Sequence, residues 1–146
     1  MNNCYPKHVT IVDVSPRDGL QNESMIVPTA VKQALIEDLI VAGVRKIETT
    51  SFVSPKWVPQ MSDNSDLMKS LAPSRNEDVI YSVLVPNMRG FDNAVNHRPD
   101  EVVIFASASE TFSQKNINCS IDESIERFAP VAAAAKAQGI KVRGVI

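Results

Sequence analysis

The sequence predicts an α/β fold built on a parallel sheet. Short segments rich in Val and Ile recur along the chain and alternate with helical patterns, which is typical of βα units. The segment Val102–Ala106 is apolar without alternation, as expected for a parallel strand buried on both faces. The 146 residues, 44% of them hydrophobic, contain no repeat or linker. We therefore expect one domain, residues 1–146.

Five strands are predicted, and five do not complete a closed (β/α)8 barrel, which takes about 250 residues. The pattern leaves two architectures open: an open doubly wound sheet, or the first part of a larger barrel. The sequence ends in or at the last strand, and an uncovered apolar edge favours aggregation. We therefore expect the isolated chain to aggregate or self-associate. The predicted strands are Val9–Val14, Lys46–Thr50, Val79–Val85, Glu101–Ala106 and Lys141–Ile146.

Helices are predicted between these strands. The first runs from Ala30 to Ala42, with Thr29 as the expected N-cap and Gly43 as its stop. Shorter helices are expected over Asp63–Leu71 and Met88–Asn96, where they would depend on packing against the sheet. The apolar face of the first helix is expected to consist of Val31, Leu35 and Leu39.

The last helix begins at a capping box formed by Ser120 and Glu123, and Gly139 closes it. Pro130 lies inside this pattern, where it removes a backbone donor and clashes with the preceding turn. We expect a kink there, or a helix that restarts after it.

The composition excludes several classes of partner. The net charge is −2 with both signs interspersed, so neither nucleic acid nor a membrane surface is expected as a partner. No apolar run approaches membrane-spanning length, and residues 1–7 resemble neither a signal peptide nor an Arg-rich presequence. We expect a cytoplasmic location. Cys4 and Cys119 are expected to be reduced thiols, and His8 and His97 are isolated in sequence.

Charged residues at the ends of the first strands form the candidate site. Arg17 and Asp18 follow the first strand, and Glu48 lies in the second. Because parallel strands converge at their carboxyl ends, the carboxylates of Asp13, Asp18 and Glu48 would gather there and suit Mg²⁺ or Mn²⁺. Arg17 would then stabilise a developing oxyanion. The alternative is a structural ion pair between Arg17 and either Glu48 or Asp13.

Polar loops follow the other strands. The loop Ser51–Met61 carries Trp57 and either forms a rigid wall for a ligand or packs over the sheet. Asn87 either presents its amide to a ligand or caps the next helix. Ser107–Cys119 reads as a polar loop of the kind that carries function. No common nucleotide-binding or hydrolase motif is present in the sequence.

Three segments resemble the 3-hydroxy-3-methylglutaryl-CoA lyase family: DVSPRDGLQNE (residues 13–23), IETTSFVSPKWVPQM (residues 47–61) and KNINCS (residues 115–120). The first pattern is shared by a metallolyase superfamily that includes isopropylmalate and homocitrate synthases, and the other two are similar to the lyase branch. The resemblance covers residues 8–144. It implies an α/β fold of the parallel (β/α) TIM-barrel type, truncated to about the first five strands.

The resemblance also implies an activity, the retro-Claisen cleavage of 3-hydroxy-3-methylglutaryl-CoA to acetoacetate and acetyl-CoA in leucine degradation and ketone-body formation. Asp18 matches the family's carboxylate metal ligand, Arg17 the arginine that contacts the thioester carbonyl, and Glu48 the glutamate that completes the triad. The implied cofactor is Mg²⁺ or Mn²⁺, and the implied partner is an acyl-CoA. Asp13 and Gln21 match supporting polar positions, and Gln21 and Asn87 are expected to bind substrate together with Arg17.

The sequence departs from the family pattern in one large respect. The family's His-x-His pair, a further asparagine and a glycine-rich loop with a catalytic cysteine are absent, and Cys119 belongs to a different motif. With one ligand we expect the 146-residue chain neither to bind metal tightly nor to cleave substrate alone. The alternatives are a truncated, non-catalytic remnant or partial barrel acting only with another chain, or a related isopropylmalate or homocitrate synthase-type enzyme.

Overall fold

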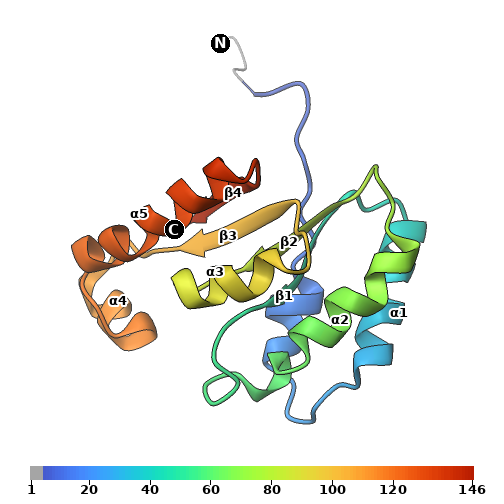
Figure 1. Ribbon diagram of the computed structural model, residues 1–146, viewed down its shortest axis with the longest axis horizontal. Coiled ribbons are helices and arrows are strands. Elements are labelled where there is room, and N and C mark those ends of the chain that lie inside the picture. The colour runs from blue at the N-terminus through green and yellow to red at the C-terminus, as the bar shows by residue number, and fades with distance from the viewer. Residues whose placement is uncertain (1–4) are drawn as a thin grey trace.

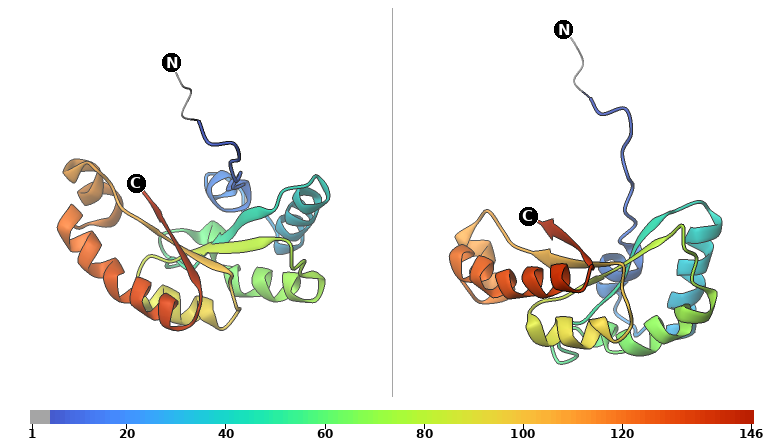
Figure 2. Two further views of the ribbon diagram at one scale, coloured as in Figure 1. Left: turned by 90° about the horizontal axis from the view of Figure 1, so that it is seen from above. Right: turned by 45° about the horizontal axis from the view of Figure 1, so that its top comes forward.

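A computed structural model describes residues 5–146 as a curved parallel sheet covered on one side by helices (Figure 1). Seen from above, helices α1, α2, α3 and α5 form an arc outside the strands (Figure 2). All three strand pairs are parallel, in the spatial order β1-β2-β3-β4. The strands are β1 (Lys46–Ser51), β2 (Ile80–Leu84), β3 (Glu101–Phe105) and β4 (Lys141–Val145). The predicted parallel α/β fold is therefore confirmed.

Helix α1 precedes β1, the later helices connect successive strands, and the helices lie on the convex side of the sheet (Figure 2). None of the helices in the described part of the chain is long and apolar enough to cross a membrane. Three short turns, η1 (Ser15–Gly19), η2 (Pro59–Met61) and η3 (Ala72–Ser74), complete the architecture. The helices are α1 (Thr29–Val41), α2 (Asn64–Leu71), α3 (Met88–Val95), α4 (Glu110–Ile117) and α5 (Ile121–Ala137).

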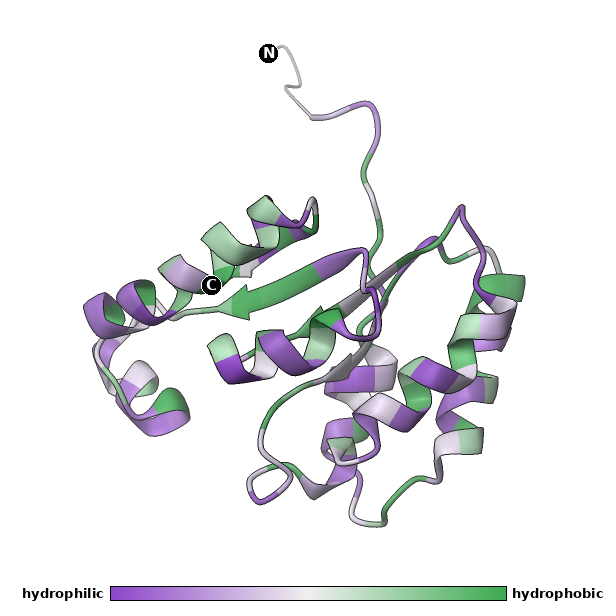
Figure 3. Cartoon of the chain, viewed as in Figure 1, coloured by the Kyte–Doolittle hydropathy of each residue, from purple (hydrophilic) through white to green (hydrophobic). Residues whose placement is uncertain are grey.

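The apolar core lies between the sheet and these helices. Strand β3 is hydrophobic along Val102–Phe105 after a hydrophilic start at Glu101 (Figure 3). Because alternate residues of a strand face opposite sides, one set of strand side chains faces the helices and the other faces the concave side. The helix-facing set forms two buried clusters and includes Ile47, Tyr81, Val83, Val85 and Val102.

The predicted first strand is wrong. Within Val9–Val14 only Asp13 pairs with the sheet, through one isolated parallel bridge to Ile47. The side chains of Val9 and Ile11 are 72% and 71% exposed, so these β-branched residues have no packing surface that would favour an extended strand. The other four strands form within a residue or two of the predicted bounds.

The helix predictions need three corrections. Pro28, not Thr29, occupies the N-cap of α1, and the Thr29 hydroxyl donates to Asp63 at 2.7 Å. Val31 is exposed, because the face of α1 that packs inward is centred on Lys32 and Ile36. Residues 110–117, predicted as loop, form α4, which Ser109 caps and which the left-handed Asn118 ends.

Helix α5 begins with the predicted capping box of Ser120 and Glu123. It does not restart after Pro130, because one helix runs through that residue, which is exposed. The accepted hydrogen bonds from Ser120 hold the pKa of the Glu123 carboxyl below its usual value. Cys119 is buried and free, whereas Cys4 lies outside the described residues.

Gly90 is the position where backbone space limits the fold. A Cβ placed there would lie 2.7 Å from Pro86 Cδ and 2.8 Å from the Phe52 carbonyl oxygen. We expect Gly90→Ala to reduce the free energy of unfolding by about 1–3 kcal/mol, the usual effect of overpacking. Gly144→Ala is the matched control, because a Cβ there meets nothing within 4 Å. Equal urea midpoints for the two variants would contradict this packing.

Candidate active site

The concave face of the sheet carries several charged side chains. Glu48 pairs in register with Ser82, and Ser82 pairs with Glu101, so the three side chains lie in one row on one face. Both glutamates are buried. The register of β1 then shifts between Glu48 and Thr50, an irregularity of the kind that re-aims side chains beside functional sites.

Six residues of this face form a continuous network of ion pairs, which we call the concave charge network. Glu48 accepts from two arginines, one on each oxygen: Arg17 Nε at 2.5 Å and Arg143 Nη2 at 2.6 Å. Glu101 likewise accepts from Arg143 Nε at 2.9 Å and Lys46 Nζ at 2.5 Å. Asp18 lies at the end of the network, 2.6 Å from Arg17 Nη1. The members are Arg17, Asp18, Lys46, Glu48, Glu101 and Arg143.

The backbone around Asp13 sets Arg17 beside Glu48. Asp13 N donates to the Lys46 carbonyl at 2.9 Å, and Glu48 N donates to the Asp13 carbonyl at 2.8 Å. The chain then turns at once into η1, where Arg17 N and Asp18 N both donate to the Val14 carbonyl. The two charged residues are thereby held against the centre of β1, Arg17 with a side chain 15% exposed and Asp18 with one 57% exposed.

The predicted cluster of three carboxylates is wrong. Asp13 Oδ1 accepts from the backbone and hydroxyl of Ser15 at 2.9 and 2.5 Å, and both oxygens of Glu48 are taken by guanidinium groups. The structure instead contains the alternative ion pair of Arg17 with Glu48. Among residues 5–146 no three acidic, histidine or cysteine side chains gather as a metal site. The described residues therefore do not fit a divalent cation by themselves, and Asp18 is the exposed carboxylate of the concave charge network.

The remaining candidates occupy the surroundings of this site. Asn87 Oδ1 accepts from Gly90 N at 3.0 Å and so caps α3, the second of the two alternatives for this residue. Gln21 is half-buried just after η1. Trp57 is 86% exposed, so its ring does not pack over the sheet.

Three charged residues of the network were not among the predicted site residues. Lys46, Glu101 and Arg143 complete the concave charge network. The available signal was the alternation of charged and apolar residues in Lys46–Glu48 and in Lys141–Arg143, which places the charges on one face.

A further buried charge, Lys32, was also missed. Its Nζ donates to the Gln60 carbonyl and, at 2.7 Å, to Asp63 Oδ1. The Gln60 amide in turn bonds to Val27 N and to the Met25 carbonyl, both at 2.8 Å. These contacts tie the segment before α1 to η2 and α2.

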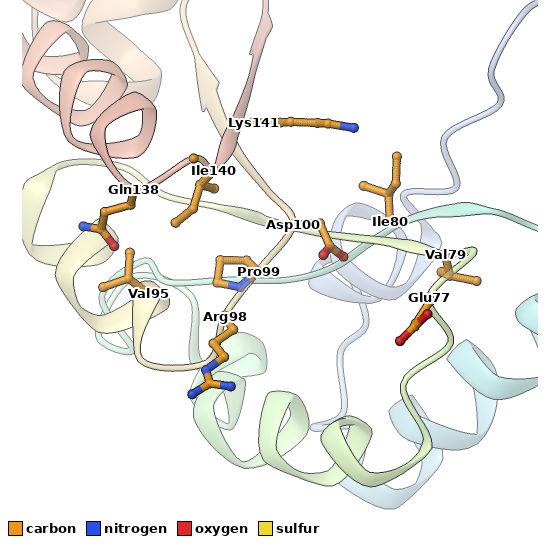
Figure 4. A pocket seen from close by; sticks show the side chains of 11 residues that line it. Glu77, Val79, Ile80, Val95, Arg98, Pro99, Asp100, Gln138, Ile140 and Lys141 are labelled. Carbon is orange, nitrogen blue, oxygen red and sulfur yellow. The ribbon is translucent and has the colours of Figure 1, made fainter.

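A hollow of about 580 Å³ lies at the opposite, amino ends of the strands (Figure 4). Its lining mixes both signs of charge, with Arg98 and Lys141 beside Glu77 and Asp100. Asp100 is already engaged, because its Oδ2 accepts from Tyr81 N and from Arg75. Catalytic groups of parallel α/β folds lie at the carboxyl ends, so the concave charge network is the stronger candidate.

The model of the HMGL-like family matches residues 8–146. The chain belongs to the HMGL-like family. It is 55% identical over 142 residues to mitochondrial hydroxymethylglutaryl-CoA lyase of Bos taurus, covering 97% of this chain and 43% of that protein. It is 56% identical over 141 residues to the cytoplasmic 3-hydroxy-3-methylglutaryl-CoA lyase of Danio rerio, covering 97% and 42%. The chain thus spans less than half the length of these relatives.

Solved structures of HMG-CoA lyases have the same fold as this chain over their matched parts. The HMG-CoA lyase of Brucella melitensis superposes with a TM-score of 0.91 at 53% identity, over 96% of this chain and 49% of that one. An HMG-CoA lyase of Acinetobacter baumannii in complex with coenzyme A and 3-methylmalate gives 0.86 at 34%, over 93% and 44%. The four-stranded sheet of this HMGL-like chain is therefore part of a TIM-barrel fold, and the predicted family resemblance is confirmed. HMGL-like enzymes depend on a metal.

The predicted cytoplasmic location is wrong by these comparisons. The similar lyases of Bos taurus, Rattus norvegicus and Mus musculus are named mitochondrial, although that of Danio rerio is named cytoplasmic. The prediction depended on the composition of residues 1–7. Members of one family occur in mitochondria and in the cytoplasm, and the composition of a short segment does not distinguish these two compartments.

Removing the charge of Glu48 tests the network in this HMGL-like chain. Glu48→Gln leaves two guanidinium groups without their shared carboxylate. We expect the free energy of unfolding to fall by about 2 kcal/mol, less than the roughly 3–5 kcal/mol for breaking a fully buried pair, because both arginines keep partial contact with water. Urea denaturation measures the change.

Asp66→Asn provides the control for this prediction. Asp66 forms an exposed ion pair with Lys69 at 3.7 Å, and such pairs contribute about 0.5 kcal/mol or less. If both variants shift stability equally, Glu48 is not held as described.

Proposed function

We propose that the chain is the N-terminal portion of a 3-hydroxy-3-methylglutaryl-CoA lyase, which cleaves its substrate to acetoacetate and acetyl-CoA, a step of leucine degradation and ketone-body formation. The observation that carries the proposal is the arrangement of Arg17 between buried Glu48 and exposed Asp18 on the concave face. Similarity to lyases in sequence and in fold supports it. Residues 1–146 would act as a single domain of a pyruvate carboxyltransferase/HMG-CoA lyase-like barrel.

The chemistry requires a group that stabilises an enolate. Loss of the proton from the tertiary hydroxyl of the substrate is followed by cleavage of the adjacent carbon–carbon bond. The bonding electrons move onto the two-carbon thioester fragment, and the resulting enolate of acetyl-CoA is then protonated. Most of the barrier to this cleavage lies in the charge that develops on the thioester oxygen, and fixed hydrogen-bond donors lower such a barrier.

Arg17 is suited to this role in substrate binding and catalysis. Its Nε and one Nη1 proton are held by Glu48 and Asp18, while its other N–H donors make no hydrogen bond to a side chain within residues 5–146. A guanidinium group fixed on one edge presents its remaining donors in a defined plane. We propose that these donors bind the thioester oxygen and that Glu48 acts by orienting them.

The other proposed site residues surround Arg17. Asp18 would supply one carboxylate ligand to Mg²⁺ or Mn²⁺, hard cations that take oxygen ligands, and the described residues do not complete that ligand set. Gln21 and Asn87 would contact the acyl-CoA substrate, Asn87 through its amide nitrogen, because its oxygen caps α3. No step of the reaction is assigned to the metal.

A second candidate is a non-catalytic partial barrel that acts only with another chain or with a second copy of itself. Strand β4 pairs with β3 alone among the described strands, and Val142 and Val145 on it are partly exposed. Such an edge favours association. Sedimentation of the purified chain distinguishes the two states: we expect oligomers or aggregates, and a monodisperse monomer that melts cooperatively would contradict this.

The proposed activity is tested with the chain alone and with a hybrid in which it is joined to the C-terminal part of the Brucella melitensis lyase. We expect the chain alone to produce no acetoacetate. The hybrid should produce acetoacetate when 3-hydroxy-3-methylglutaryl-CoA is added. Arg17→Met in the hybrid should lower kcat by about 100- to 1,000-fold, the usual effect of losing an oxyanion donor.

The matched control is Arg45→Met. The Arg45 guanidinium donates only to the carbonyls of Ile40 and Val44 and contacts no member of the concave charge network. Its loss should therefore leave kcat unchanged. A folded hybrid without activity, or one indifferent to Arg17→Met, would refute the proposed function.

A further inference from the structure

The guanidinium group of Arg143 joins the two buried glutamates of the concave face. Its Nη2 is 2.6 Å from Glu48 Oε2, and its Nε is 2.9 Å from Glu101 Oε1. Glu48 and Glu101 have side chains 1% and 5% exposed, so this contact takes place largely out of water. Arg143 is not part of the triad of Arg17, Asp18 and Glu48, so the proposed function gives it no role.

The contact depends on the curvature of the sheet. Arg143 is on β4 and Glu48 is on β1, and β2 and β3 lie between them. Ser82 occupies the register position between the two glutamates, and its hydroxyl donates to the Ile47 carbonyl at 3.1 Å. Because this side chain is small and turned to the backbone, it leaves room for Arg143 to reach across the concave face.

Arg143 determines how Glu48 can hold Arg17. A carboxylate with one free oxygen can turn and pair with a single guanidinium through both oxygens. In this structure the second oxygen of Glu48 is occupied by Arg143, so Arg17 is held through Nε on the first oxygen only. Apart from the Nη1 proton bound by Asp18, the outer donors of Arg17 then make no hydrogen bond within residues 5–146, which is the property that its proposed role requires.

The position of Arg143 is itself fixed. Arg143 donates to both Glu101 and Glu48, so the guanidinium cannot move away without breaking two ion pairs, and Lys46 also holds Glu101 in place. Burial lowers the pKa of Arg143, but the hydrogen bonds and charges of Glu101 and Glu48 outweigh it and raise the pKa above its ordinary value. Arg143 therefore remains charged throughout the working pH range.

We propose that Arg143 is a positioning residue, which holds the Glu48 carboxylate in the orientation that directs Arg17 toward the substrate thioester. This inference rests on the proposed function, because it assigns a task to the orientation of Arg17. The orientation itself is measurable without catalysis.

The first measurement is the ¹H–¹⁵N signal of Arg17 Nε–H, recorded in the hybrid, because we expect the isolated chain to aggregate. Arg143→Met should move this signal and increase its exchange with water by about tenfold, because Glu48 becomes free to turn. Arg45→Met, which removes a guanidinium bound only to backbone carbonyls, should leave the signal in place. An unchanged Arg17 signal in folded Arg143→Met overturns the proposal, whatever the activity.

The second measurement separates positioning from a loss of stability. In the hybrid, Arg143→Met should lower kcat by about 10- to 100-fold, the usual effect of a small displacement of a catalytic group, with KM changed less than about threefold. Arg143→Lys keeps the positive charge that both glutamates require and should recover part of kcat. If Arg143→Met does not fold, Arg143→Gln, which carries no charge to pair with the two glutamates, takes its place, and a wild-type Arg17 signal in that variant overturns the proposal. Absence of activity in the wild-type hybrid contradicts the proposed function alone.

Discussion

The concave face of this protein depends on the buried carboxylate of Glu48. A carboxylate removed from water costs several kcal/mol unless positive charge and hydrogen bonds surround it. Glu48 receives both from Arg17 and Arg143, which come from opposite ends of the described chain. The requirement for charge compensation therefore joins the segment before α1 to the last strand. An open sheet without curvature would separate Arg143 from Glu48 and leave one oxygen of the carboxylate without its partner.

The same strands supply both an apolar face and a charged face because their side chains alternate. Ile47 and Tyr81 pack under helices on the convex side, whereas Glu48 and its register partner Ser82 face the concave side. Apolar burial stabilises the sheet from one face, and the ion pairs determine which side chains meet on the other. The site is thus held by backbone elements whose positions the apolar clusters already determine.

The sequence predicted the elements and contacts that depend on local patterns of residues. It did not predict the contacts that depend on the curvature of the sheet. Valine- and isoleucine-rich runs located four strands, and the Ser120 capping box located the start of α5. Val9–Val14 failed because β-propensity has no effect without a surface to pack on. Arg17 and Glu48 were predicted to meet because both follow from strand order, whereas Arg143 meets Glu48 across two intervening strands, which no spacing in the sequence encodes.

The distribution of charge also shows which part of the proposed chemistry these residues can support. Orientation of Arg17 needs only Glu48, Arg143 and Glu101, all of which lie within the described chain. A hard cation needs several oxygen ligands, and here Asp18 offers one, while Glu48 is fully occupied by guanidinium groups. Each Glu48 oxygen already faces a guanidinium group, and the positive charge of Arg17 and Arg143 disfavours a cation beside them. In the proposed reaction Glu48 therefore orients Arg17, and a metal site would require donors that the described residues do not supply.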